Sequence, residues 1–242
     1  MAEITNICIG VQARSTSTRF PRKVLEYIGS KRMLDEVIDR CFESSNYINR
    51  FTLKRGVMVS IALLIPENDE LHELYRKERP NLMIFTGSED NVLSRYKKLC
   101  DKTRADYVVR ITSDCPRIEP PLITKCINVA VKNQCDYVSN VDEDTRTAPD
   151  GHDCEVISKR LIEYMMEHAD KEEKEHVTLM ARRNPPDWAN VAHIIGYTDQ
   201  SNQKISVDTP DDLERVRADD SIVKLKIERA HSKSGRRSVH RY

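Results

Sequence analysis

Apolar runs and helical segments alternate along the first 140 residues. The apolar runs predict buried strands over 6–13, 57–64, 82–85, 107–111 and 136–140. Between them, apolar positions at helical spacing predict helices over 33–44, 70–78, 91–103 and 120–133. Strands and helices that alternate at these lengths predict an α/β fold with a three-layer, mostly parallel sheet.

The pattern changes after about residue 141. A polar stretch over 142–153 lacks periodicity. The segments that follow are typical of an insertion on the sheet. They are a short apolar segment over 155–158, helices over 159–168 and 171–183, and a strand over 190–197. A short strand over 204–207 and a helix over 210–218 come last. We therefore expect one domain over 1–231, with an inserted substrate or dimerisation region over 142–197. Ser, Arg, Lys and His without an apolar pattern predict a disordered tail over 232–242.

Charge and cysteine content narrow the class of protein. Lys and Arg total 39 and Asp and Glu total 39, a balance that argues against a nucleic-acid binder acting through bulk positive charge. No apolar run approaches the roughly 20 residues of a membrane span. The seven cysteines are odd in number and form no CxxC pair, which favours reduced thiols and a cytoplasmic protein over a disulfide framework or a zinc site.

A basic, hydroxyl-rich loop follows the first predicted strand. Residues 14–23 carry four cations and four hydroxyl groups, and ligands of open α/β sheets bind beyond the carboxyl ends of the strands. The planar fork of arginine and the compact charge of lysine suit a polyphosphate. Neither GxxxxGK[ST] nor GxGxxG is present, so the sequence supports neither a P-loop NTPase nor a Rossmann dehydrogenase. The alternative reading is a solvated basic turn.

The same loop carries a motif, Ala-Arg-x-x-Ser-x-Arg-x-Pro-x-Lys-x-Leu, filled at every fixed position from Ala13 to Leu25. The chain thereby resembles the cytidylyltransferases that make CMP-activated acidic sugars, above all the spore-coat polysaccharide branch related to CMP-Kdo and CMP-sialate synthetases. The likeness continues in order through 87–96, 110–116, 146–155, 175–178 and 206–214. Arg32 and Lys174 depart from residues that are frequent in the family, and neither is a group to which we assign chemistry.

This resemblance implies a nucleotide-diphospho-sugar transferase-like, Rossmann-like fold and a homodimer. It also implies an Mg²⁺-dependent transfer from CTP to an acidic sugar, giving a CMP-sugar and pyrophosphate for surface polysaccharide or glycoconjugate synthesis. Two alternatives stay open: a non-catalytic nucleotide-binding module of a polysaccharide assembly system, and a nucleotidyltransferase with another acceptor such as a phosphonate. The choice of CTP rests on the resemblance alone, because a phosphate loop does not discriminate bases.

Two aspartates are candidate metal ligands. Asp114 follows the predicted strand over 107–111, where a carboxylate suits Mg²⁺, although an ordinary turn cap is an equal alternative. Asp208 precedes a helix start that Thr209 and Pro210 already explain as N-cap and first helical residue. The resemblance makes both aspartates catalytic metal ligands together with catalytic Arg14 and Lys23. It assigns nucleotide contacts to Ala13, Arg14, Ser15, Arg19, Lys23 and Ser113.

The polar loop and a helical histidine are candidates for the acceptor site. Arg146 is expected to pair with the sugar carboxylate, and Asp150 and Asp153 to accept its hydroxyl groups or orient the nucleophile. Glu155 ends the same segment and is included as substrate-binding. A solvated surface loop is the alternative. His176 would ordinarily be structural, and the resemblance of its Glu-His-Val-Thr segment implies a role at the substrate site or a dimer contact.

Overall fold

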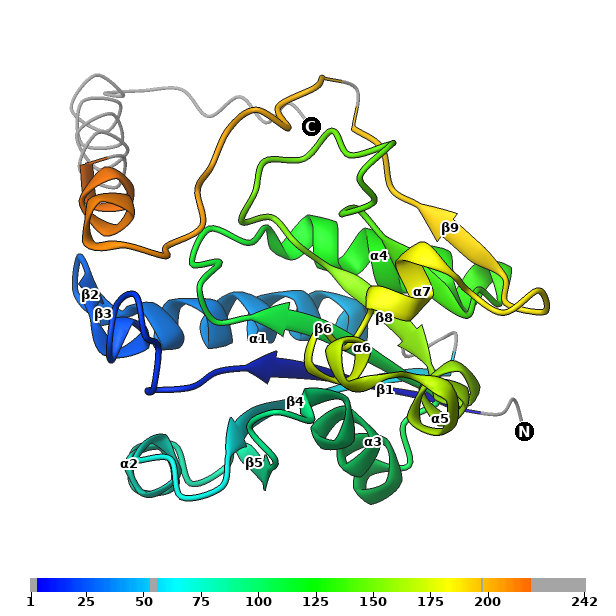
Figure 1. The fold of residues 1–242 in the computed structure, drawn as a ribbon, viewed down its shortest axis with the longest axis horizontal. Coiled ribbons are helices and arrows are strands. Elements are labelled where there is room, and N and C mark those ends of the chain that lie inside the picture. The colour runs from blue at the N-terminus through cyan, green and yellow to red at the C-terminus, as the bar shows by residue number, and fades with distance from the viewer. Residues whose placement is uncertain (1–3, 53–55, 197, 219–242) are drawn as a thin grey trace.

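The computed structural model describes residues 4–52, 56–196 and 198–218. Its main sheet has seven strands in the order β5-β4-β1-β6-β8-β7-β9 (Figure 1). The strands are β1 Thr5–Gln12, β4 Val57–Pro66, β5 Met83–Gly87, β6 Tyr107–Thr112, β7 Tyr137–Ser139, β8 Glu155–Ser158 and β9 Val191–His193. β1 pairs in parallel with β4 and β6, β4 with β5, and β7 with β9, whereas β8 runs antiparallel to both β6 and β7.

Helices cover both faces of this sheet and make three layers. α1 Met33–Thr52, α2 Leu71–Glu78 and α4 Pro120–Asn133 lie on one face, and α3 Val92–Thr103, α5 Lys159–His168, α6 Lys171–Glu175 and α7 Leu179–Arg183 on the other. A small hairpin of β2 Tyr27–Ile28 and β3 Lys31–Arg32 precedes α1, and residues 210–218 are helical. The predicted α/β fold is confirmed, with most elements of the first 140 residues placed within a few residues.

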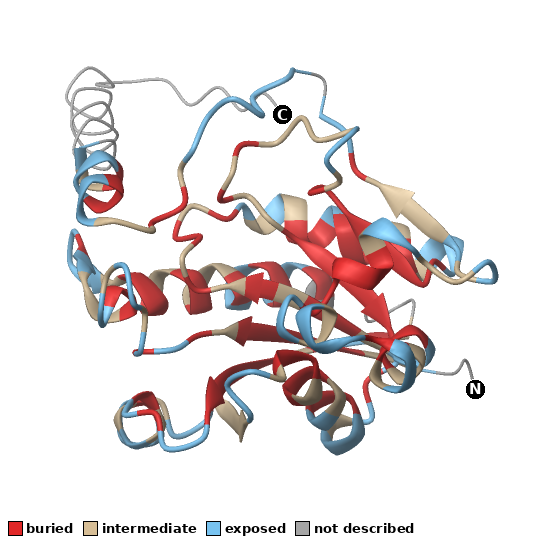
Figure 2. Ribbon diagram, viewed as in Figure 1, coloured by how far each residue is buried: buried red, intermediate tan, exposed pale blue. Residues whose placement is uncertain are grey.

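Strand alternation divides the core into two clusters. On β1, Ile7, Ile9 and Val11 face α1 and α4, while Cys8 and the positions in step with it face α3 and α5. Burial is concentrated in the sheet and the inner helix faces (Figure 2). Within the described residues no helix combines the length and apolarity needed to cross a bilayer.

The region over 142–197 differs from the predicted insertion. β8 and β9 belong to the main sheet, with β8 in its interior between β6 and β7. All four residues of β8 are buried, so the segment has no alternation that would reveal a sheet strand. Domain limits at residue 231 and the tail over 232–242 fall outside the described residues.

Two further elements differ from the sequence prediction. The expected helix over 171–183 is divided into α6 and α7 because Val177 adopts a left-handed φ of 51°, which a continuous helix excludes. The predicted strand over 204–207 is irregular, with a single parallel bridge between Asp150 and Lys204. Within the described part of the chain, its bridge partner is the polar loop, which offers no ladder to extend.

Candidate active site

The basic loop is folded back onto the carboxyl ends of β1 and β4. Ala13 N donates to Leu64 O at 3.0 Å, and Ser15 N donates to the Asp69 carboxylate at 2.8 Å. Arg22 N then donates to Ser15 O at 2.9 Å and closes the loop. These backbone bonds fix the start and end of the loop, so its cationic side chains project from a defined frame.

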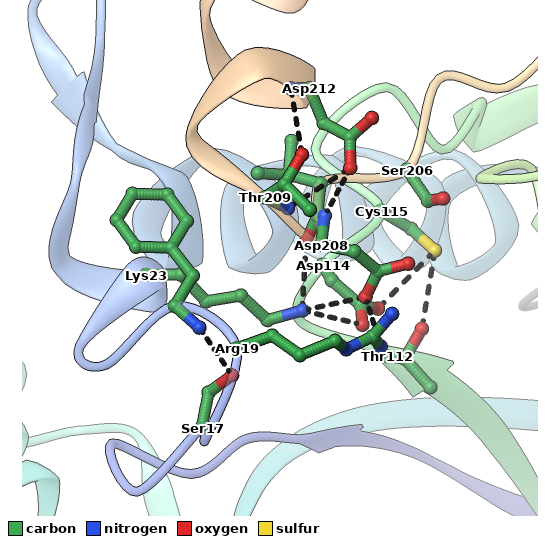
Figure 3. Close-up of polar contacts among 12 residues, drawn as sticks. Ser17, Arg19, Lys23, Thr112, Asp114, Cys115, Ser206, Asp208, Thr209 and Asp212 are labelled. Atoms are coloured by element: carbon green, nitrogen blue, oxygen red, sulfur yellow. Dashed lines mark hydrogen bonds and ion pairs between the residues drawn. The ribbon is translucent and has the colours of Figure 1, made fainter.

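Lys23 is the buried member of this set of cations. Its residue is 8% exposed, and its Nζ donates to Val207 O at 2.7 Å. The same Nζ lies 3.1 Å from the Asp114 carboxylate and 3.2 Å from that of Asp208 (Figure 3). Asp114 and Asp208 are thus brought to one point, although they are 94 positions apart in the chain and follow different elements.

Asp208 is held in place by the start of the following helix. The Asp212 carboxylate accepts from Asp208 N at 2.9 Å and Thr209 N at 3.0 Å, and Thr209 Oγ1 accepts from Asp212 N at 3.3 Å. Burial alone would raise the pKa of Asp208, but hydrogen bonds and positive charge from Lys204 and Lys23 hold that pKa below its usual value. Asp208 is therefore an ionised carboxylate at neutral pH.

A cavity of about 360 Å³ opens beside this cluster, at the carboxyl ends of β1 and β6. Its volume falls in the range of roughly 300–1,000 Å³ that is typical of small-molecule sites. Cations, carboxylates and hydroxyl groups line most of it: Gln12, Ala13, Arg14, Ser17, Thr18, Arg19, Lys23, Val24, Glu89, Val92, Arg95, Arg110, Thr112, Ser113, Asp114, Glu175, His176 and Asp208. A polar pocket with convergent cations and two adjacent carboxylates is suited to a phosphorylated ligand.

Comparison with known proteins decides the family. A family model described as cytidylyltransferase matches residues 7–218. The chain belongs to the cytidylyltransferase family. It is a nucleotidyltransferase, and the likeness recognised in the loop motif is confirmed.

Three relatives are similar to this cytidylyltransferase over most of its length. The spore coat polysaccharide biosynthesis protein SpsF of Bacillus subtilis is 27% identical over 223 residues, covering 89% of this chain and 86% of SpsF. A solved cytidylyltransferase from Leptospira borgpetersenii has a TM-score of 0.77 and 20% identity, covering 98% of this chain and all of the other. CMP:2-keto-3-deoxy-manno-octonic acid synthetase, solved with CTP, has a TM-score of 0.65 and 15% identity, covering 92% and 100%. The two structures share the fold of this cytidylyltransferase.

Most of the nucleotide and metal candidates lie at the cavity. Ala13, Arg14, Arg19, Lys23, Ser113, Asp114 and Asp208 all line it. The Arg14 side chain is 52% exposed and pairs with Glu89 at 3.4 Å, and Arg19 Nη2 donates to Asp208 at 2.9 Å. Ser15 is the exception, because it is buried and its described polar contacts anchor the loop backbone to Asp69 and Arg22.

The polar loop over 146–153 binds itself and the C-terminal segment. Arg146 donates to Asp153 at 2.6 Å and to the carbonyl of Pro149 at 2.8 Å, and Asp150 accepts from Ser206 Oγ at 2.9 Å. Arg146, Asp150 and Asp153 do not line the cavity described above. Arg146 already has a carboxylate partner, so a substrate carboxylate would have to displace Asp153.

Glu155 does not suit direct substrate binding. Its residue is 1% exposed, and its carboxylate accepts from Arg110 at 2.6 Å and from the Tyr137 hydroxyl at 2.5 Å. Burial would raise the pKa of Glu155, but Arg110 and the Tyr137 hydroxyl lower it. The sequence reading included Glu155 because it ends the polar segment. In the sheet interior Glu155 is paired with Arg110, and Arg110 rather than Glu155 lines the cavity.

His176 does lie at the cavity wall, next to Glu175. The break between α6 and α7 produces this placement, since His176 caps α6 just before the left-handed Val177. A continuous helix, as the sequence predicted, would have carried the pair along a helix face. The turn instead brings both residues into the lining of the cavity.

The sequence prediction assigned no site role to several polar residues of the cavity, among them Gln12, Glu89, Arg110 and Thr112. Two of them had a detectable signal. Gln12 and Arg110 occupy the alternating positions of β1 and β6 that are in step with Cys8 and Val108, near the carboxyl ends of the strands. A polar residue in step with buried apolar ones at that end of a strand indicates a ligand-facing position.

The donor set near Lys23 fits a divalent cation shared with a substrate. Among the described residues, no three His, Cys, Asp or Glu side chains gather into a metal cage. Two carboxylates that reach one cation, as Asp114 and Asp208 do with Lys23 Nζ, match the way Mg²⁺ is held by one or two carboxylates plus substrate phosphates.

Proposed function

We propose that this cytidylyltransferase couples CTP to an acidic sugar with Mg²⁺, releasing pyrophosphate. The observation that carries the proposal is the meeting of Asp114, Asp208 and Lys23 in the lining of a cavity that holds further cations. In the reaction an anomeric hydroxyl oxygen bonds to the α-phosphorus of CTP and loses its proton to solvent. The bond between the α-phosphorus and the bridging oxygen to the β-phosphate breaks, and pyrophosphate leaves.

The basic loop would hold the triphosphate. Lys23 is buried and fixed by Val207 O, so it offers a positioned charge close to the reacting phosphate. Arg19 and Arg14 are exposed, with side chains 68% and 52% accessible, and can turn toward the outer phosphates. Such positioned cations stabilise the charge that shifts to the leaving pyrophosphate.

Asp114 and Asp208 would hold Mg²⁺ against the phosphates. When bound, the ion would neutralise phosphate charge and favour departure of pyrophosphate. Asp212 and Lys204 keep Asp208 ionised and oriented for this task. Ionised oxygen ligands are those that Mg²⁺ prefers.

The acceptor would enter between the metal carboxylates and the turn at His176. Arg110, Glu175 and His176 line the same cavity and come from elements other than the basic loop. An acidic acceptor is supported by the fold neighbour named for 2-keto-3-deoxy-manno-octonic acid, and a role in polysaccharide synthesis by the name of SpsF. Arg146, Asp150 and Asp153 would then hold the polar loop in its conformation around the site. If Arg146 binds the sugar carboxylate, that contact would replace its bond to Asp153.

A homodimer and a cytoplasmic location complete the proposal. The expected dimer contact lies within 142–197, where Trp188 is 43% exposed and packs edge-on against Tyr164. Light scattering at micromolar concentration is expected to give twice the chain mass, and a monomer would overturn this part alone.

The test is pyrophosphate release with Mg²⁺, each of the four NTPs and a panel of sialic, Kdo, pseudaminic and legionaminic acids. We expect release with CTP and one acid only. Asp114→Asn and Asp208→Asn should each lower kcat by about 100-fold or more, since each removes charge at the developing transition state. Glu43→Gln, an exposed carboxylate distant from the cavity, is the matched control and should leave the rate unchanged.

The alternatives have distinct outcomes in the same assay. Release with a phosphonate but no sugar acid would keep the chemistry and replace the acceptor. Tight CTP binding without release for any acceptor would instead support a non-catalytic nucleotide-binding module.

A further inference from the structure

Glu89 is a carboxylate in the lining of the cavity that the proposed reaction does not use. Among the described residues, four carboxylates line this cavity: Glu89, Asp114, Glu175 and Asp208. Asp114 and Asp208 converge on Lys23 and suit a metal ion. Glu89 comes instead from the turn between β5 and α3, and it contacts the basic loop. A negative charge beside bound phosphates opposes their binding, so its presence in a phosphate site calls for a reason.

The Glu89 carboxylate accepts from two residues of the basic loop through the same oxygen. Thr16 Oγ1 donates to Glu89 Oε1 at 2.8 Å, and Arg14 Nη1 donates to it at 3.4 Å. The first distance is that of an ordinary hydrogen bond, whereas charge-assisted bonds from a guanidinium are usually about 2.7–2.9 Å long. Thr16 therefore anchors the carboxylate, and Arg14 is held loosely enough to change partner.

The backbone around Glu89 is fixed on both sides. Gly87 O accepts from Glu67 N at 2.8 Å, and Ser88 Oγ accepts from Asn91 N at 3.0 Å. Asn91 is in turn the N-cap of α3. The Glu89 side chain remains 46% exposed between these fixed points. Its position opposite the basic loop is thus defined, while its charge stays accessible to ions in the cavity.

The exposure of the Arg14–Glu89 pair argues against a role in stability. The two side chains are 52% and 46% exposed, and ion pairs as accessible as this contribute little to the free energy of unfolding. The basic loop also has an ion pair outside the cavity lining, between Arg22 and Glu70 at 2.8 Å. A pair that only held the loop could lie there as well. Glu89 instead brings its charge to the place where phosphates are expected.

We propose that Glu89 competes with pyrophosphate for Arg14 and thereby speeds release of this product. The inference rests on the proposed function, in which Arg14 turns toward the outer phosphates and these leave as pyrophosphate. While phosphates hold Arg14, Glu89 keeps its bond to Thr16 but has lost the guanidinium. Return of Arg14 to Glu89 stabilises the enzyme without pyrophosphate, so the charge of Glu89 favours the free state over the bound one.

Glu89→Gln tests the competition, because glutamine keeps an acceptor oxygen for Thr16 and removes only the charge. Magnesium pyrophosphate is expected to bind this variant about fivefold more tightly than the wild type, near the upper end of what an exposed ion pair contributes. Most of the change should lie in slower release. Calorimetry gives the affinity, and stopped-flow displacement gives the release rate. CTP should bind more tightly by a similar factor, because it carries the same outer phosphates.

Further variants separate competition for Arg14 from other effects of the substitution. In an Arg14→Met background, Glu89→Gln should change the affinity for magnesium pyrophosphate by less than about twofold. Thr16→Val keeps both charges and should not tighten binding. Asp90→Asn removes the neighbouring carboxylate, which is exposed and outside the cavity lining, and is the matched control. Melting temperatures of all variants report the fold.

The outcomes separate this inference from the proposed function. Weaker pyrophosphate binding by Glu89→Gln would make Glu89 a support of the loop, and unchanged pyrophosphate binding with weaker CTP binding would place it at the nucleoside. Either result overturns the competition, as does equal tightening with and without Arg14. A wild type that binds neither CTP nor magnesium pyrophosphate overturns the proposed function together with this inference.

Discussion

Replacing Glu155 by glutamine is expected to destabilise the protein strongly, although the two side chains have nearly the same shape. The Glu155 side chain is 2% exposed and neutralises Arg110, whose side chain is 18% exposed. Removing one partner of a buried pair costs about 3–5 kcal/mol, because the other charge stays buried without compensation. Arg110 keeps some access to the cavity, so we expect the lower end, about 3 kcal/mol.

Urea unfolding measures this loss through a lower midpoint at an unchanged slope. In a chain of this size 1 kcal/mol shifts the melting temperature by about 2–4 °C, so the melting temperature should fall by about 6–12 °C. Glu43→Gln, an exposed carboxylate, is the control and should change stability by less than about 0.5 kcal/mol.

A double substitution separates the unpaired charge from a general intolerance of the position. Arg110→Met combined with Glu155→Gln removes the guanidinium and leaves an amide oxygen that can accept from the Tyr137 hydroxyl. We expect this variant to be more stable than Glu155→Gln alone. A loss below about 1 kcal/mol for Glu155→Gln, or a double variant less stable than the single one, would refute the reasoning.

Three more predictions follow from the same contacts. The pKa of Glu155 is lower in the folded protein than in the unfolded chain, where it is about 4.3. The ionised Glu155 therefore stabilises the fold above that value, and this stabilisation is lost as pH falls through the folded-state pKa. The free energy of unfolding should consequently fall more steeply with decreasing pH in the wild type than in Glu155→Gln. Gly151→Ala places a Cβ 2.5 Å from Ser206 N, at a residue whose φ is 114°. We expect this variant to lose at least about 1–3 kcal/mol of stability, measured as a lower melting temperature. Asp212→Ala should lower the stability by about 1 kcal/mol because it removes a helix cap, and it should lower kcat/KM because Asp208 is no longer held in place. Asp212→Asn keeps an acceptor oxygen and should retain most activity. Equal activity in the two variants would contradict the positioning role of Asp212.

Much of the fold could be predicted from the sequence because its strands are apolar runs bounded by helices of clear periodicity. α4 begins at Pro120 and ends at Asn133 as predicted, since its start is marked by two prolines. β8 could not be placed, because four buried residues show no period and its partners precede it by about 20 and 50 positions. Strand order is a property of long-range pairing, which local patterns do not encode.

The candidate site was predictable where chemistry depends on residue type at a fixed spacing. The loop motif identifies Lys23. Asp208 is identified because Thr209 and Pro210 already explain the start of the helix over 210–218, which leaves this aspartate without a capping role. Their contact could not be foreseen, because they are 185 positions apart. Conversely, Arg146 and Glu155 have suitable chemistry for a substrate site but are occupied by Asp153 and Arg110, and such internal pairing is visible only in three dimensions.

The interior position of β8 has a consequence for the order in which this chain can be synthesised and folded. Until Ser158 has left the ribosome, β6 has a free edge and β7 has no strand to join it to the rest of the sheet. The nascent chain therefore exposes the unpaired backbone of two apolar strands while about 20 further residues are made, a few seconds at most at typical rates of elongation. Such edges promote pairing between chains, so a pause while Glu155–Ser158 are still inside the ribosome would favour aggregation, whereas a pause after these residues have emerged would not.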